Sequence, residues 1–197
     1  MSEKTQIPAR GAWANPTAAG LVALSVACVC FWALLTGRVG AGAMPLIGAW
    51  LFGGFIIQFV VGVLDLRSGN TAGGNTFLFF SAFFMFVSGL EMMLKYSAAA
   101  SGAPLEGQLD GYVWAALTLV LWLWTPAFCK KFSMLSIVIL LLDLGLPFVA
   151  LTDLGILAKS YTHIAGWAML ASGAVAIYLC SAMVINATYG KKLYPVF

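Results

Sequence analysis

The sequence predicts an all-α integral membrane protein with six transmembrane helices. Of its 197 residues, 62% are hydrophobic and only 9% are charged, and the mean hydropathy is +0.97. A soluble domain carries about 25% charged residues. The apolar sequence falls into stretches of about twenty residues, the length that crosses a bilayer. We therefore expect one transmembrane domain over residues 15–190, between a polar tail at 1–14 and a short tail at 191–197.

The first helix is predicted at 16–36. Asn15 can cap its start, and Pro16 suits a first turn, where a missing N–H has no consequence. The helix contains no charged residue, and its many small residues would let another helix approach closely. It therefore reads as a membrane helix that packs against its neighbours.

The next two helices are predicted at 45–64 and 76–96. Pro45 again stands at a first-turn position. The residues from Asp65 to Thr76 are rich in glycine and asparagine, so we expect them to form a loop. A polar segment at 97–110 then separates two halves of three helices each.

The second half of the chain contains helices predicted at 112–128, 132–152 and 163–187. The first of these ends in tryptophans and a Lys130–Lys131 pair, which is typical of a membrane edge. With six spans, both tails and two connections share one side of the membrane. That side holds seven of the ten basic residues, so the positive-inside rule predicts cytoplasmic termini; the seven are Lys4, Arg10, Arg67, Lys130, Lys131, Lys191 and Lys192.

Several classes of function are disfavoured. The net charge of +3 comes from scattered residues, which argues against nucleic acid as a partner. The single histidine and the absence of a Cys–His cluster predict no metal site. No pairing of nucleophile and base is visible, so we expect neither an enzyme nor a cofactor.

Polar residues inside the predicted spans are the candidates for function. Gln58 shares a helix face with Gly54 and Gly62, so it either bonds across a close helix contact or lines a solute path. Glu91 precedes Lys95 by one turn, in the order that favours a structural ion pair.

Asp143 lies near the middle of a predicted span, with no basic residue in reach on its own helix. Pro147 cannot donate a hydrogen bond to the Asp143 carbonyl, so a kink is expected there. An acid beside opened backbone is tolerated only where it faces protein or water. A proton-linked or solute-path role is favoured over a purely structural hydrogen bond.

Five motifs resemble the succinate–acetate permease family of acetate uptake transporters. They are NPTAAGL at 15–21, the acid-then-GNT loop at 65–71, HIAGW at 163–167, GAVAIYL at 173–179 and YGKKLYP at 189–195. The resemblance implies a homohexamer in the cell membrane, with one path per six-helix subunit. It implies passage of acetate and related monocarboxylates, with succinate as a further candidate, by channel-like or proton-linked transport.

The resemblance also implies a hydrophobic constriction, whose positions here correspond to Leu24, Phe80 and Leu141. Ala176 corresponds to a small pore-facing position, and Asp143 falls at or beside the constriction. Leu24 replaces an aromatic residue of the family, which changes the shape of the narrow point. An ionised Asp143 there would repel an anion, so it should be protonated or couple a proton to transport.

Physical considerations agree with such a path. An acetate anion loses far more hydration than neutral acetic acid in an apolar constriction. Helix N-termini near Asn15 and Thr76 could hold a carboxylate before it crosses. Two alternatives stay open: a channel for a small neutral solute such as urea or ammonia, and a membrane protein that transports nothing.

Overall fold

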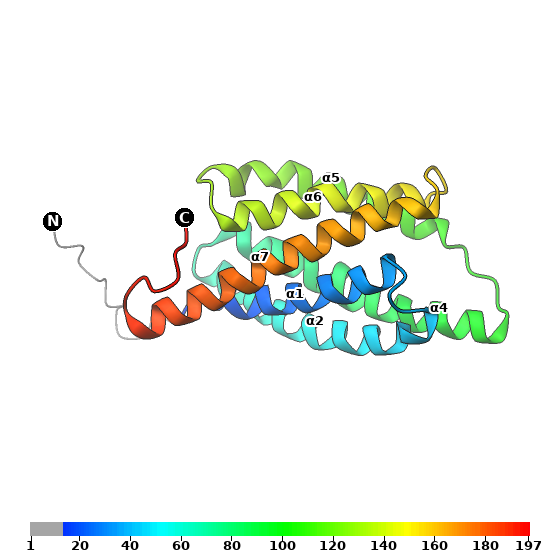
Figure 1. Ribbon diagram of the computed structural model, residues 1–197, viewed down its shortest axis with the longest axis horizontal. Coiled ribbons are helices and arrows are strands. Elements are labelled where there is room, and N and C mark those ends of the chain that lie inside the picture. The colour runs from blue at the N-terminus through cyan, green and yellow to red at the C-terminus, as the bar shows by residue number, and fades with distance from the viewer. Residues whose placement is uncertain (1–13) are drawn as a thin grey trace.

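The computed structural model describes residues 14–197, and over that range every element of regular structure is helical. Six helical spans in this part of the chain are long and apolar enough to cross a membrane. They lie side by side in an elongated bundle (Figure 1). The predicted N-terminal tail lies outside the described residues, apart from Ala14.

The first two spans are α1 (Thr17–Leu35) and α2 (Met44–Arg67), joined through the 3-10 turn η1 (Ala41–Ala43). Asn15 Oδ1 accepts a hydrogen bond from Thr17 N at 2.9 Å. It therefore satisfies one of the N–H groups that a helix start leaves unpaired. Pro45 lies in the first turn of α2, as predicted.

The third span is one continuous helix made of α3 (Thr71–Phe79), the π-helical segment η2 (Phe80–Val87) and α4 (Ser88–Ser101). The loop expected from Asp65 to Thr76 is therefore wrong, because only 68–70 interrupt the helices. Glycine serves close packing here. A Cβ added at Gly74 would lie 2.8 Å from the backbone nitrogen of Leu66 on α2.

The remaining spans begin or end close to the predicted positions. Ser133 and Ser136 form a capping box at the start of the fifth span. The observed elements are α5 (Gln108–Cys129), α6 (Met134–Asp153), the 3-10 turn η3 (Lys159–Tyr161) and α7 (Thr162–Tyr189).

The first span, α1, packs closely against α7 and α2. A Cβ added at Gly173 of α7 would lie 3.0 Å from Cys28 Cβ. Ser25 Oγ also donates to the Gly173 carbonyl oxygen at 3.2 Å. The small residues of α1 therefore serve helix packing, as their distribution predicts.

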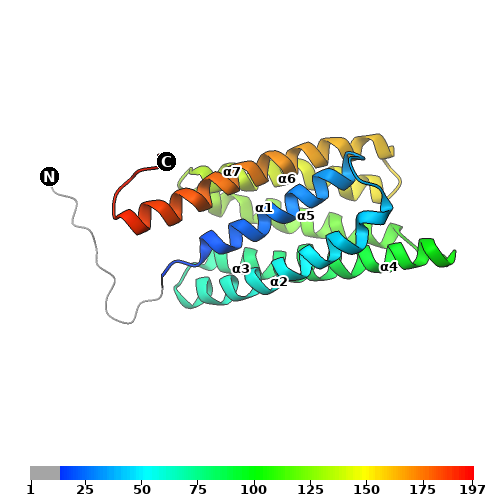
Figure 2. The ribbon, with the colours of Figure 1, turned by 60° about the horizontal axis from the view of Figure 1, so that its bottom comes forward.

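Both described ends of the chain lie at the same end of the bundle, which we call the N/C end (Figure 2). The α2–α3 and α5–α6 connections lie there too, whereas the α4–α5 connection lies at the opposite end (Figure 1). This alternation is what six spans require.

Candidate functional site

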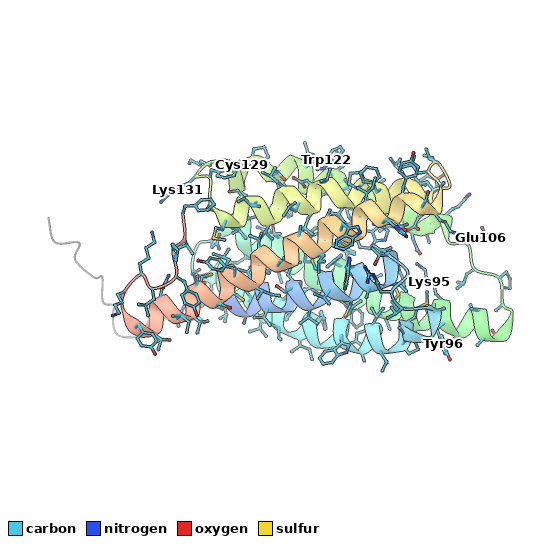
Figure 3. The ribbon with its side chains drawn as sticks, in the orientation of Figure 1. Lys95, Tyr96, Glu106, Trp122, Cys129 and Lys131 are labelled. Atoms are coloured by element: carbon cyan, nitrogen blue, oxygen red, sulfur yellow. The ribbon has the colours of Figure 1, made fainter. Side chains whose placement is uncertain are left out.

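A cavity of about 440 Å³ opens at the N/C end of the bundle. Its walls come from α1, α2, α3, η2, α5 and α6. Lys130 and Lys131, which follow α5, lie at its mouth, and Figure 3 shows Lys131 at that end of the molecule. Deeper in, the wall is largely apolar and includes Leu21, Leu24, Phe77, Phe80, Val138 and Ile139.

Two buried polar side chains line this first cavity with an atom that has no partner among the described residues. Gln58 is 1% exposed, and its Nε2 donates to the Gly20 carbonyl oxygen at 3.2 Å. Its Oε1 is left without a donor. Thr76 is 6% exposed, and its hydroxyl oxygen is also unpaired. Unpaired polar atoms in an apolar wall are costly, which makes these two atoms candidates for contact with a polar solute.

A second polar network supports the rim of the cavity. Asp65, at 2% exposure, accepts from Asn70 Nδ2 at 3.0 Å and lies 3.4 Å from the Thr17 hydroxyl through both carboxylate oxygens. Thr17 and Asn70 line the cavity. The network fixes the start of α1 against the α2–α3 connection. Asp65, the acid of the acid-then-GNT motif, therefore holds two residues of the cavity wall without lining the cavity itself.

A smaller cavity of about 170 Å³ lies at the opposite end of the bundle. Its walls come from α1, α2, η2, α4, α5, α6 and α7 and are largely apolar, with three charged residues among them. These are Glu91 and Lys95 of α4 and Asp153 of α6. We call it the second cavity.

Two phenylalanine rings in contact lie where the walls of the two cavities meet. Phe80 lines the first cavity and Phe84 the second, and their ring centroids are 5.3 Å apart in a T-shaped contact. Phe84 also contacts Phe31 of α1, at 4.9 Å between centroids, and Trp114 of α5, at 6.0 Å. Both rings of the pair belong to η2, and π-helical segments are frequent at functional sites.

The structure brings together two of the three residues assigned to the constriction. Leu24 and Phe80 line the first cavity, but Leu141 lines neither cavity. Ile139 of the same helix does line the first cavity. Residues two positions apart on a helix point in nearly opposite directions, so a two-residue offset changes the face. Ala176 is fully buried in the core and lines neither cavity.

The helix N-termini expected to hold a carboxylate are placed differently. Thr76 lies inside α3, which begins at Thr71, so it offers its hydroxyl group and no helix terminus. Asn15 is exposed and lines neither cavity, whereas Thr17 lines the first. The first cavity therefore relies on side chains. Sequence reasoning missed Thr17 and Ile139, because nothing in the sequence shows how the helices are rotated.

Asp143 also lies away from both cavities, at the contact between α5 and α6. Its Oδ2 accepts from the Thr125 hydroxyl at 2.6 Å. Its backbone carbonyl, which Pro147 cannot engage, accepts from Trp122 Nε1 at 3.1 Å. Asp143 of α6 is therefore bonded to α5. The sequence predicted that it would lie at or beside the constriction, but it does not line the first cavity.

Together, these features define a multi-pass helical membrane protein with a cavity toward each end of its bundle. The chain belongs to the GPR1/FUN34/yaaH family, whose model matches residues 2–193.

Named relatives and a solved structure share most of the chain. It is 28% identical over 190 residues to the succinate-acetate/proton symporter SatP of Escherichia coli K12, covering 93% of this chain and 95% of the relative. It is 26% identical over 200 residues to an uncharacterised protein of Methanothermobacter thermautotrophicus, covering 98% and 95%. The solved structure of the bacterial acetate channel SatP superposes with a TM-score of 0.81 at 23% identity, covering 94% of this chain and all of that one. The six-helix fold is therefore shared.

Proposed function

We propose that this protein passes acetate and related small monocarboxylates across the membrane through its two cavities. The observation that carries the proposal is the pair of unpaired buried polar atoms, Gln58 Oε1 and Thr76 Oγ1, in the wall of the first cavity. A small carboxylic acid offers one O–H donor and one carbonyl acceptor. Gln58 Oε1 can only accept, and the Thr76 hydroxyl can donate, so the two complement a neutral carboxyl group.

Protonation of the solute in the first cavity lets it cross the aromatic layer, by which we mean the rings of Phe80 and Phe84. An acetate ion would lose its hydration between Phe80 and Phe84, whereas neutral acetic acid loses far less. Lys130 and Lys131 at the mouth of the first cavity attract the anion before it takes up a proton. Flux should therefore rise as pH falls toward the range, roughly pH 4 to 5, where carboxylic acids titrate. Channel-like passage and coupled proton movement both fit this route.

The relatives support the same class of solute. One is named a succinate-acetate/proton symporter and another an acetate channel, and neither name describes an enzyme. For this chain we propose acetate as the principal solute and succinate as a secondary one. A channel for urea or ammonia, the alternative solutes, should show flux that does not depend on carboxylate.

We further propose that the protein is a homohexamer in the cell membrane, with both termini in the cytoplasm. The basic residues at the N/C end support this orientation. Apolar grooves on the outer faces of α1, α2 and α7 offer surface for lipid or for a second copy. Their lining includes Val22, Val26, Val29, Trp50 and Ile177.

The test is uptake of labelled acetate into liposomes that contain the purified protein, with and without an imposed proton gradient. Saturable uptake that increases when the exterior is acidic supports coupled entry of the acid. Uptake that follows the acetate gradient and the voltage alone supports a channel. Absence of uptake, beside a working control transporter, rejects acetate, and labelled urea then tests the neutral-solute alternative.

A further inference from the structure

Lys95 lies at the second cavity among acids from three helices. Its ammonium nitrogen lies 3.8 Å from Glu91 Oε2, one turn earlier on α4, and it makes a closer ion pair with Asp110 at the start of α5. Asp153, the last residue of α6, lines the same cavity as Glu91 and Lys95. The Lys95 and Asp110 side chains are 33% and 15% exposed. Water therefore reaches this group, but it is less screened than a free surface pair.

Close contact between α5 and α6 explains why these groups converge. A Cβ added at Gly111 would lie 2.6 Å from the backbone nitrogen of Leu154. Glycine therefore lets the first turn of α5 lie against the end of α6. This contact places Asp110 near enough to Asp153 for the two carboxylates to interact electrostatically.

Acids outnumber cations at this mouth. Glu91, Asp110 and Asp153 surround a single lysine of the cavity wall, and Lys159 of η3 acts on Asp153 from the exposed side. The wall residues from the other elements are uncharged and include Phe31, Met44, Trp114 and Thr162. Among residues 14–197, Lys95 is therefore the one cation of the wall that an incoming anion meets, and it is already shared between carboxylates.

We propose that Glu91, Lys95, Asp110 and Asp153 form a charge filter that selects monoanions over dianions. This inference rests on the proposed passage of carboxylates. Lys95 exchanges Asp110 for the single carboxylate group of an incoming monoanion. A dianion brings a second negative charge among the remaining acids, and the repulsion lowers its occupancy by about tenfold.

Substrate competition tests the filter. Liposomes containing the full-length protein take up labelled acetate at about pH 7.5, where succinate is mostly a dianion and butyrate a monoanion. Either competitor is present on both faces of the membrane. Relative to wild type, Glu91→Gln should lower the inhibition constant of succinate by about tenfold and that of butyrate by only about threefold, because the Coulomb energy scales with the charge of the anion. Glu106→Gln is the matched control, because Glu106 is an exposed acid in the α4–α5 connection at the same end (Figure 3).

Asp153→Asn removes a charge of the filter from a different helix and should change succinate inhibition in the same direction. Asp153→Asn therefore still tests the filter if Glu91→Gln does not fold. Folding of each variant is judged from its size-exclusion profile and melting temperature. Unchanged succinate inhibition in both folded variants, with acetate uptake intact, overturns the filter and leaves the proposed function standing. If the wild-type protein takes up no acetate, the proposed function fails and the filter fails with it.

Discussion

The indole nitrogen of Trp122 donates a hydrogen bond to the backbone carbonyl oxygen of Asp143, 3.1 Å away on the neighbouring helix. In a regular helix, that carbonyl would accept from the residue four positions later. That residue is Pro147, which has no N–H. Trp122 is half exposed, so its apolar ring faces outward while its one donor is directed at the gap in α6. A residue of α5 thus completes the hydrogen bonding of α6.

Replacing Trp122 with phenylalanine should destabilise the folded protein by about 0.5–1 kcal/mol, because the Asp143 carbonyl loses its donor in an apolar medium. In a Pro147→Ala background the cost should shrink, since alanine supplies the missing N–H. Thermal melting in detergent measures the coupling between the two positions. It is carried out on the wild type, both single variants and the double variant. Trp50→Phe is the control, because Trp50 is 64% exposed on α2 and has no hydrogen-bond partner among residues 14–197. Equal costs of Trp122→Phe in the two backgrounds would contradict the assignment.

Two glycines of α2 should respond oppositely to alanine. A Cβ at Gly62 would lie 2.9 Å from Leu78 N and 3.0 Å from the Gly74 carbonyl oxygen, so neighbouring backbone must move. Gly62→Ala should therefore destabilise by about 1–3 kcal/mol. Gly53 has nothing within 4 Å of an added Cβ, and Gly53→Ala should be neutral or slightly stabilising. Thermal melting of the two variants decides, and equal losses would show that the α2–α3 contact is less tight than described.

Gln58→Met should reduce acetate flux by about fivefold, because it removes the acceptor that the proposed function assigns to the carboxyl O–H. It also removes the bond to Gly20, so melting temperature must be measured alongside transport. Gln108→Met is the control, at the exposed first residue of α5. Flux that stays at the wild-type value in a folded Gln58→Met protein would remove Gln58 from the path.

The aromatic layer should set the size limit of the solute. Phe80→Leu replaces a ring of this layer by a smaller side chain and widens the opening between the cavities. Uptake of butyrate relative to acetate should therefore rise by about fivefold. Phe83→Leu removes the same volume from a neighbouring ring that is 43% exposed and should leave the ratio unchanged. Measuring a ratio cancels differences in expression. A similar change in both variants would mean that general loosening of η2, and not the layer, sets selectivity.

Asp143→Asn should leave acetate flux and its pH dependence within about twofold of wild type, because Asp143 lines neither cavity and asparagine can still bond to Thr125. Asp143→Leu should lower the melting temperature, since the Thr125 bond is lost. Uptake is compared across a series of external pH values. A flattened pH profile in Asp143→Asn would return this acid to the proton route that its sequence position suggested.

Local sequence properties determined the class and the outline of this protein. A helix that crosses a bilayer needs about twenty apolar residues, so stretches such as 17–35 and 134–153 are recognised from length and composition alone. The Glu91–Lys95 pair is equally local, because residues one turn apart on a helix are neighbours, and the structure contains it. Gln58 was singled out as a polar residue inside a span, and it lies in the wall of the first cavity.

Tertiary structure alone decided which faces of the helices meet. Whether Ile139 or Leu141 faces the first cavity depends on the rotation of α6 about its axis. Most faces of that helix are apolar, so the sequence does not indicate which one lines the cavity. The Asp65–Thr76 glycines looked like a loop because the α2 backbone against which they pack is not visible in a local pattern. The partners of Lys95 and Asp143 on α5 lie 15 to 21 residues away in the sequence. Hydropathy is a property of single residues, whereas a path is made by the relative positions of distant ones.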